Sequence, residues 1–246
     1  MKVNVEYCDP FDGIEENFWM KVEHCGRYIW AAQCLRDKGC RTVADIACAN
    51  GYGSRILAGV AEQVIAVDRN KTYLSLAEKD DAVKYICCDL DEEPLPEEIM
   101  NIDAIVCFET LEHLRKPEAN LKAFSEYLSP GGFLLLSVPN ERYEILDEDG
   151  RNKDPFHLHI FSKDTVLTLL ENSGFYVEMI LGQEICNRIV TRISELDKSG
   201  QVMKKETEKL WSYDRDKIEI VSRIFGMPDR LNIEESYSHI YICRKS

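Results

Sequence analysis

The run Val-Ala-Asp-Ile-Ala-Cys-Ala-Asn-Gly-Tyr-Gly at residues 43–53 is the feature that most constrains the fold of this chain. A short apolar strand delivers Asp45 into a turn of small residues, and a helical stretch follows from Ser54. Small side chains let a ligand approach the backbone, and the start of a helix offers free N–H groups. A second apolar strand, 64–67, ends at Asp68, where an acid can accept hydrogen bonds from ribose hydroxyls. The chain therefore opens as a nucleoside-binding βαβ unit.

The same turn disfavours two common nucleotides. A dinucleotide-binding turn has the pattern G-x-G-x-x-G. Here Gly51 and Gly53 are followed by Ile56, where the third glycine would stand, so NAD is disfavoured. The pattern G-x-x-x-x-G-K-[ST] does not occur in the sequence, so a phosphate loop of the ATP-binding type is disfavoured as well.

The small-residue turn, with Asp45 before it and Asp68 after it, resembles that of the class I S-adenosylmethionine (SAM)-dependent methyltransferases. Their motif is usually Asp-x-Gly-x-Gly-x-Gly, and Ala47 and Ala49 replace two of its glycines. Alanine allows close approach of a ligand but adopts positive φ less readily than glycine. The resemblance implies SAM as the cofactor and S-adenosylhomocysteine as its product.

Apolar strands alternate with helical stretches along the chain. We expect strands at about 42–47, 63–67, 83–88, 103–108, 133–138, 175–181 and 238–244. We expect helices at about 15–38, 53–61, 71–79, 117–128 and 162–173. This alternation predicts an α/β fold, a doubly wound parallel sheet with helices on both faces. The resemblance makes it a Rossmann-like, mostly parallel seven-stranded sheet with the last strand antiparallel.

The length of 246 residues fits a single domain, with residues 1–38 as an N-terminal helical segment. Residues 184–234 form a connection between the last two strands that is too long for a hairpin loop. This segment is rich in charge and helical in period, so we expect a helical insertion over the substrate site. A surface decoration or a contact between two copies of the chain is the alternative.

Composition limits the partners. The net charge of −14 repels nucleic-acid backbones, so nucleic acid is a poor substrate. No stretch of about 18 apolar residues is present, so no membrane-spanning helix is expected, and no signal peptide is visible. The ten cysteines form no C-x-x-C pair and several lie in apolar strands, which is typical of reduced thiols in a cytoplasmic protein. Oligomeric state is not readable from the sequence.

Ligands of open α/β sheets bind outside the carboxyl ends of the strands. That rule selects the residues that follow the expected strands: 45–53, Asp68, Arg69, Asp89, Leu90, 108–112, Pro139 and Asn140. The resemblance adds their roles in cofactor binding. It implies that the first loop holds the methionine part of SAM, that Asp68 binds the ribose, that Asp89 lies by the adenine amine and that the Leu90 amide contacts the ring. Arg69 and Phe108 are expected at the same site.

Arg27 is a further candidate for cofactor binding. It shares a helix face with His24 and Tyr28, in a segment that resembles an N-terminal motif of many bacterial members of the family. A guanidinium pairs bidentately with carboxylates, so Arg27 would suit the methionine carboxylate of SAM. A solvated arginine is the alternative.

Two segments carry candidate proton acceptors. Residues 154–162 hold His157 and His159, and similar Pro-Phe-His sequences occur in family members linked to sugar and polysaccharide modification. A histidine has a pKa near the operating pH and suits a general base. His113, with Glu109 or Glu112, is the rival, in a strand end that resembles a Glu-x-x-Glu-His segment of the small-molecule branch. Packing or capping histidines are the alternative.

No metal site is expected, since it would need more ligands than the pair His157 and His159 supplies. The interpretation is an enzyme that transfers a methyl group from SAM to a hydroxyl of a small-molecule acceptor, a sugar or a polysaccharide precursor. N- or C-methylation of a metabolite is the alternative within enzymes. A SAM-binding, non-catalytic regulatory subunit is the alternative outside them.

Overall fold

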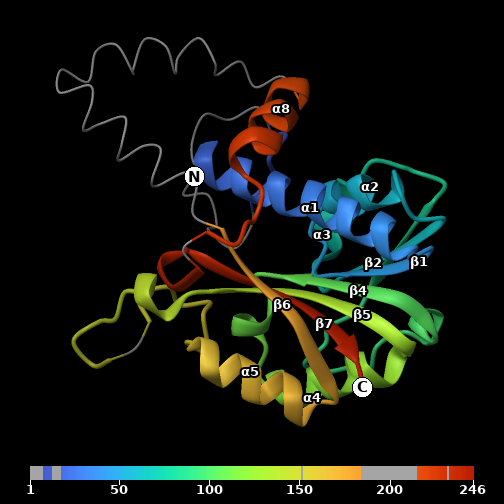
Figure 1. Cartoon of the computed structure of the whole chain (residues 1–246). Coiled ribbons are helices and arrows are strands. Elements are labelled where there is room, and N and C mark those ends of the chain that lie inside the picture. The colour runs from blue at the N-terminus through green and yellow to red at the C-terminus, as the bar shows by residue number, and fades with distance from the viewer. Residues whose placement is uncertain (1–7, 13–17, 151, 184–214, 232) are drawn as a thin grey trace, which may run out of the picture.

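A single seven-stranded sheet organises the chain (Figure 1). The computed structural model describes residues 8–12, 18–150, 152–183, 215–231 and 233–246. The strands, in sheet order, are β3 (Val83–Cys87), β2 (Gln63–Asp68), β1 (Thr42–Ile46), β4 (Ile102–Phe108), β5 (Leu128–Pro139), β7 (Ser238–Lys245) and β6 (Phe175–Gln183). The α-helices are α1 (Phe18–Lys38), α2 (Tyr52–Ala58), α3 (Lys71–Ser75), α4 (Pro117–Tyr127), α5 (Lys163–Asn172) and α8 (Arg215–Phe225).

Strands β1 to β5 pair in parallel, and β7 lies antiparallel between β5 and β6. Helices α1, α2 and α8 lie on one side of the sheet, and α4 and α5 lie on the other (Figure 1). The predicted fold class, including the antiparallel last strand, is therefore confirmed.

Side chains of the central strands alternate between two apolar layers. In β1, Ala44 and Ile46 join the layer beneath α4 and α5, whereas Val43 joins the layer beneath α1 and α2. In β4, Ile105 and Val106 divide in the same way. Because both faces are covered, these strands are mostly apolar, as is usual in parallel sheets, with Asp45 as the buried acid of β1.

Strand β5 and helix α3 differ most in length from their predictions. Strand β5 begins at Leu128 rather than 133, because Gly131 takes a φ of +73° and carries the chain through the expected turn into the sheet. Helix α3 ends at Ser75 rather than 79, and none of its residues is buried. The first helix is described from Phe18, so its predicted start lies outside the described residues.

The predicted helical insertion at 184–234 is described only in part, since residues 184–214 lie outside the described residues. In the described part, α8 packs on α1 through an apolar cluster that includes Val22, Ile218 and Val221. The backbones meet at Gly26 of α1 and at Gly226, which directly follows α8. A Cβ on Gly26 would overlap the Gly226 carbonyl, and a Cβ on Gly226 would overlap the Val22 carbonyl. Glycine is therefore required for this close approach.

Two further observations concern membrane-spanning helices and cysteines. Among the described residues, no helix is both long and apolar enough to cross a bilayer. The nine cysteines of those residues are free thiols.

Replacing Gly26 with alanine should destabilise the protein. Alanine favours a helix by ~1 kcal/mol over glycine, so helix propensity alone would stabilise the variant. The overlap with Gly226 should reverse that sign and lower the free energy of unfolding by about 1–3 kcal/mol, as overpacking does. Urea denaturation measures the difference, with the exposed Gln33→Ala in the same helix as the control. A Gly26→Ala variant as stable as the parent would contradict the helix packing described.

Candidate functional site

Two pockets adjoin at the carboxyl edge of the sheet. The first, here the acidic pocket, is lined by Asp68, Arg69, Asn70, Asp89, Leu90 and His113 among others. The second, here the aromatic pocket, is lined by Cys8, His24, Arg27, Tyr28, Tyr52 and Phe108 among others. Ala47, Ala49 and Glu109 line both. An elongated ligand could therefore lie across the loop with one end in each pocket.

Asp68 stands at the end of β2 in the acidic pocket. One carboxylate oxygen accepts the Ala49 N–H at 2.8 Å, and the other accepts the Asn70 N–H at 2.7 Å. These bonds fix the carboxylate between the loop after β1 and the start of α3. Each carboxylate oxygen can accept more than one hydrogen bond, so ribose hydroxyls could add to the two already present.

Other residues complete the acidic pocket. The loop after β3 supplies Asp89 and Leu90, and Arg69 is exposed at the rim. The prediction omitted Asn70, although its place before a helix is the usual N-cap signal. Its side chain accepts the Thr72 N–H at 2.9 Å and so holds the start of α3 at the pocket.

The loop after β1 is backbone-strained. Ala47 and Ala49 have φ values of 58° and 52°, in the left-handed region that glycine favours. These are the two positions at which alanine replaces a glycine of the motif. The methyl groups of the two alanines are accommodated, but the backbone stays strained. The hydrogen bond from the Ala49 N–H to the Asp68 carboxylate helps to hold this backbone conformation.

Gly51 and Gly53 do not appear in the lining of either pocket. Gly51 has a φ of 76° and precedes α2, and a Cβ there would overlap the ring of Tyr85. A Cβ on Gly53 would overlap the ring of Tyr28. The two glycines thus admit tyrosine rings against the loop, a role that the motif alone does not reveal.

Asp45 lies beneath the loop and also does not appear in the lining of either pocket. It is fully buried and accepts hydrogen bonds from Tyr28 Oη at 2.9 Å and Ser54 Oγ at 2.6 Å. Burial raises the pKa of Asp45 to about 7; the charge of Asp68 adds to this rise, and the two hydroxyl donors oppose it. The structure places Asp45 as a support of the loop and of the Tyr28 wall.

Arg27 is buried, so the alternative of a solvated arginine is wrong. It is 2% exposed, and its NH1 lies 3.1 Å from Glu109 Oε1. Its Nε donates to Gln183 Oε1 at 2.8 Å, and its NH1 donates to Ser137 Oγ at 3.2 Å. Its guanidinium therefore lines the aromatic pocket while already neutralised by one carboxylate.

Glu109 connects the two pockets. It follows β4 with a φ of 45°, an unusual conformation for a glutamate. Its N–H donates to the Ser137 carbonyl at 3.1 Å, and its carboxylate accepts the Ser137 hydroxyl at 2.8 Å. The Ser137 bonds hold Glu109 at the junction of the pockets, where its carboxylate lies beside Arg27.

The histidines predicted as bases divide between two places. His113 lines the acidic pocket, and its ring lies 4.9 Å from that of His157. His157 Nδ1 lies 2.9 Å from Glu144 Oε1; burial lowers the pKa of His157, but the hydrogen bond and charge of Glu144 outweigh it and raise that pKa. His159 lies apart from this pair, with Nε2 donating to the Leu114 carbonyl at 2.9 Å and the ring stacked on Phe161.

His24 was not assigned to the site from sequence, whereas Glu112 was named there with His113. His24 lines the aromatic pocket 3.3 Å from Tyr52 Oη, and burial lowers the pKa of His24 to about 3, so it is neutral at pH 7. Glu112 is buried beside His113, and burial together with the charge of Glu109 raises the pKa of Glu112 well above its usual range. The signal for His24 was its place on the same helix face as Arg27.

Comparison with known proteins identifies a shared domain. The methyltransferase domain family matches residues 26–180. A probable S-adenosylmethionine-dependent methyltransferase of Mycobacterium tuberculosis (strain ATCC 25618 / H37Rv) is 31% identical over 163 residues, covering 65% of this chain and 56% of that protein. A ubiquinone biosynthesis O-methyltransferase of Alkalilimnicola ehrlichii is 27% identical over 143 residues, covering 53% of this chain and 58% of that protein. The chain thus spans somewhat more than half the length of these curated relatives.

The fold has solved counterparts. A S-adenosylmethionine-dependent methyltransferase from Clostridium acetobutylicum ATCC 824 superposes with a TM-score of 0.61 and 11% identity, covering 94% of this chain and 96% of the other. At that identity the likeness shows the fold alone.

The stability of the protein should depend on pH through Asp45. Because its folded pKa is raised, the neutral carboxyl stabilises the fold fully below the ordinary aspartate pKa, and this contribution is lost as pH rises through about 7. Relative to Asp45→Asn, the parent should lose up to ~1.4 kcal/mol of unfolding free energy per pH unit between pH 5 and 7. Urea titrations at pH 5, 6, 7 and 8 measure it, with the exposed Asp81→Asn as the control. Parallel pH curves for the parent and Asp45→Asn would contradict it.

Proposed function

Because this chain belongs to the methyltransferase domain family, we propose that it transfers a methyl group from SAM to a hydroxyl of a small-molecule acceptor, a sugar or polysaccharide precursor. The observation that carries the proposal is the pair of adjoining pockets across the strained loop at residues 47–49. One pocket has the acids expected for an adenosine, and the other has a guanidinium and aromatic rings. SAM has a matching nucleoside end and amino-acid end.

The residues of the acidic pocket suit the nucleoside. Asp68 is already oriented by two backbone N–H groups and would accept the ribose hydroxyls. Asp89 and Leu90 lie where the adenine would enter, on the loop after β3. The sequence predicted Asp68, Asp89 and Leu90 as cofactor-binding residues, and all three line this one pocket.

The residues of the aromatic pocket suit the methionine part. The Arg27 guanidinium would face the carboxylate of SAM, and Glu109 beside it would face the ammonium. Phe108 and Tyr28, with ring centroids 5.3 Å apart, would wall the aliphatic part and exclude water. The buried ion pair thus presents both charges that an amino-acid group requires.

The reaction asks for positioning and for a proton acceptor. The acceptor oxygen attacks the methyl group, the carbon–sulfur bond breaks with its electrons on sulfur, and the hydroxyl proton must leave. Holding the two reactants in line contributes ~7–11 kcal/mol in well-oriented cases. His113 lines the acidic pocket beside Glu109, so we place the hydroxyl proton at the His113–His157 pair.

The acceptor class is argued from the loop before α5 and from the relatives. The resemblance of residues 154–162 to sugar-modifying members favours a sugar, and the O-methyltransferase relatives favour oxygen as the methylated atom. N- or C-methylation of a metabolite and a non-catalytic SAM-binding subunit are the alternatives. Release of S-adenosylhomocysteine with a panel of sugars, phenols and amines tests all three.

Asp68→Ala should weaken SAM binding at least tenfold. Hydrogen bonds to a charged group contribute ~1.5–3 kcal/mol each, and two ribose hydroxyls would lose their acceptor. Titration calorimetry with SAM measures the dissociation constant, with Asp164→Ala, an exposed acid on α5, as the control. An unchanged affinity in a folded Asp68→Ala variant would refute the ribose assignment.

His113→Ala and His157→Ala should each lower kcat by ~10²–10⁴. In His157→Ala the SAM dissociation constant should stay near that of the parent, because His157, unlike His113, does not appear in the lining of either pocket. His159→Ala, in the same loop, is the comparison for a histidine that bonds to a backbone carbonyl. The measurement is turnover under chemistry-limited conditions with the acceptor found in the panel. If all three variants keep full kcat, the proton goes to a carboxylate such as Glu109, or the acceptor is already ionised.

A further inference from the structure

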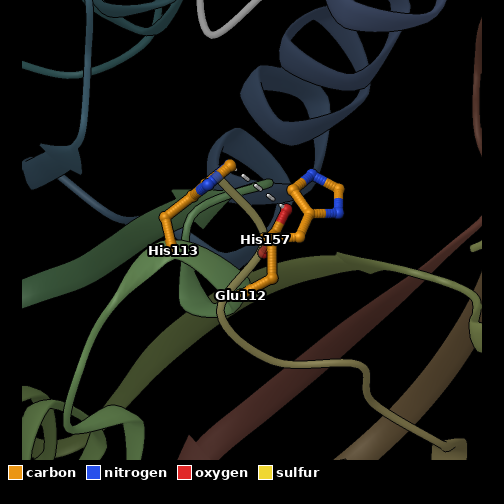
Figure 2. A group of neighbouring side chains, drawn as sticks. All are labelled: Glu112, His113 and His157. Carbon is orange, nitrogen blue, oxygen red and sulfur yellow. Dashed lines mark ion pairs between the residues drawn. The ribbon is translucent and has the colours of Figure 1, made fainter. Parts of the chain in front are cut away.

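Three side chains with metal-binding groups converge beside the acidic pocket (Figure 2). Glu112 and His113 come from the short helix η2 (Leu111–His113) after β4, and His157 comes from the loop before α5. One ligand atom of each lies within 4.8 Å of the other two. His113 Nε2 is 3.8 Å from Glu112 Oε1, the ion pair dashed in Figure 2. Tertiary structure thus brings together two imidazoles and a carboxylate.

The Glu112 carboxylate has no evident purpose in the fold. Its residue is 1% exposed, and neither carboxylate oxygen has a hydrogen-bond partner in the described part of the chain. Burying an unsatisfied carboxylate is costly. Its backbone carbonyl, in contrast, accepts the N–H groups of Leu158 and His159 and so ties the His157 loop to this place.

Both imidazoles are oriented as metal ligands usually are. His113 Nδ1 lies 2.9 Å from the Phe156 carbonyl, and His157 Nδ1 lies 2.9 Å from the Glu144 carboxylate. An acceptor at Nδ1 holds the proton there and leaves the lone pair on Nε2, the arrangement by which a second group orients a metal-binding histidine. His157 Nε2 also lies 4.0 Å from Asp154 Oδ2, which adds negative charge to the cluster.

We propose that Glu112, His113 and His157 bind one divalent transition-metal cation of the class of Zn²⁺, Mn²⁺ or Fe²⁺. Imidazole nitrogens combined with a carboxylate suit these ions better than Ca²⁺ or Mg²⁺. Donors around a tetrahedral zinc lie roughly 3.4 Å apart at bonds of ~2.1 Å, so the side chains close by rotation on binding. The bound cation would neutralise the Glu112 carboxylate, whose oxygens have no hydrogen-bond partner in the described part of the chain.

Three protein ligands leave coordination positions open, as in catalytic metal sites. Because His113 also lines the acidic pocket, the cation would lie next to that pocket. A hydroxyl bound to it would lose its proton more readily, since a Lewis acid lowers the pKa of a bound oxygen. The proton would then go to Glu109 or to water, because both histidines would be occupied as metal ligands. That consequence rests on the proposed function, whereas cation binding itself does not.

Metal binding by the full chain tests the proposal without SAM or acceptor. The protein, freed of any affinity tag and stripped with a chelator, is dialysed against Zn²⁺ or Mn²⁺, and bound metal is measured by mass spectrometry. We expect one equivalent per chain. Glu112→Gln and His157→Ala should each weaken binding at least tenfold, and Glu144→Gln should weaken it ~10–100-fold while all three ligands remain. Co²⁺ added to the stripped protein gives a visible spectrum that His157→Ala should change.

His159→Gln is the matched control, a histidine two residues away that bonds to the Leu114 carbonyl, and it should bind as the parent does. Circular dichroism establishes that each variant is folded. If Glu112→Gln does not fold, His157→Ala and Glu144→Gln carry the test. Absence of a bound equivalent, or parent-like affinity in the folded ligand variants, would overturn the site. Failure of methyl transfer alone would leave the binding result unaffected.

Discussion

The buried ion pair between Arg27 and Glu109 is the interaction on which the site depends. It joins α1 to the carboxyl end of β4, with the serine hydroxyls of β5 and β7 and the amide of β6 around it. Burying two charges is costly unless further hydrogen bonds satisfy them, and removing one partner typically costs ~3–5 kcal/mol. Here Ser137, Ser238 and Gln183 supply those bonds. The pair thereby positions α1 over the sheet and forms the junction of both pockets.

Strained backbone also lies at this carboxyl edge of the sheet. Ala47, Ala49 and Glu109 have positive φ values and line both pockets, whereas Asn101, the other non-glycine residue described with positive φ, does not appear in their lining. Strained backbone persists only where its surroundings hold it, and it gathers at ligand sites. Asp68 holds Ala49, and Ser137 holds Glu109. The two supports belong to strands on opposite sides of the loop, so the sheet itself maintains the shape of the pockets.

The group of side chains next to the pockets depends on the loop after β5. Residues 152–161 return to the end of β4, where the Glu112 carbonyl binds their backbone and His157 meets His113. Glu144 fixes His157 from the other side. A loop of this kind can change its sequence without disturbing the sheet, which is why function varies among proteins of one fold.

The sequence by itself determined the fold class, because apolar strands buried on both faces and separated by amphipathic helices leave few other solutions. It also determined that Asp68, Asp89 and Leu90 share one edge, since parallel strands end together. Tertiary structure alone decided that Asp45, Gly51 and Gly53 support tyrosine rings rather than line the pockets, and that Arg27 is neutralised by Glu109. It alone brought Glu112 to His157. Local pattern specifies which face a side chain takes on its own strand or helix, but contacts between distant segments depend on how the whole chain packs.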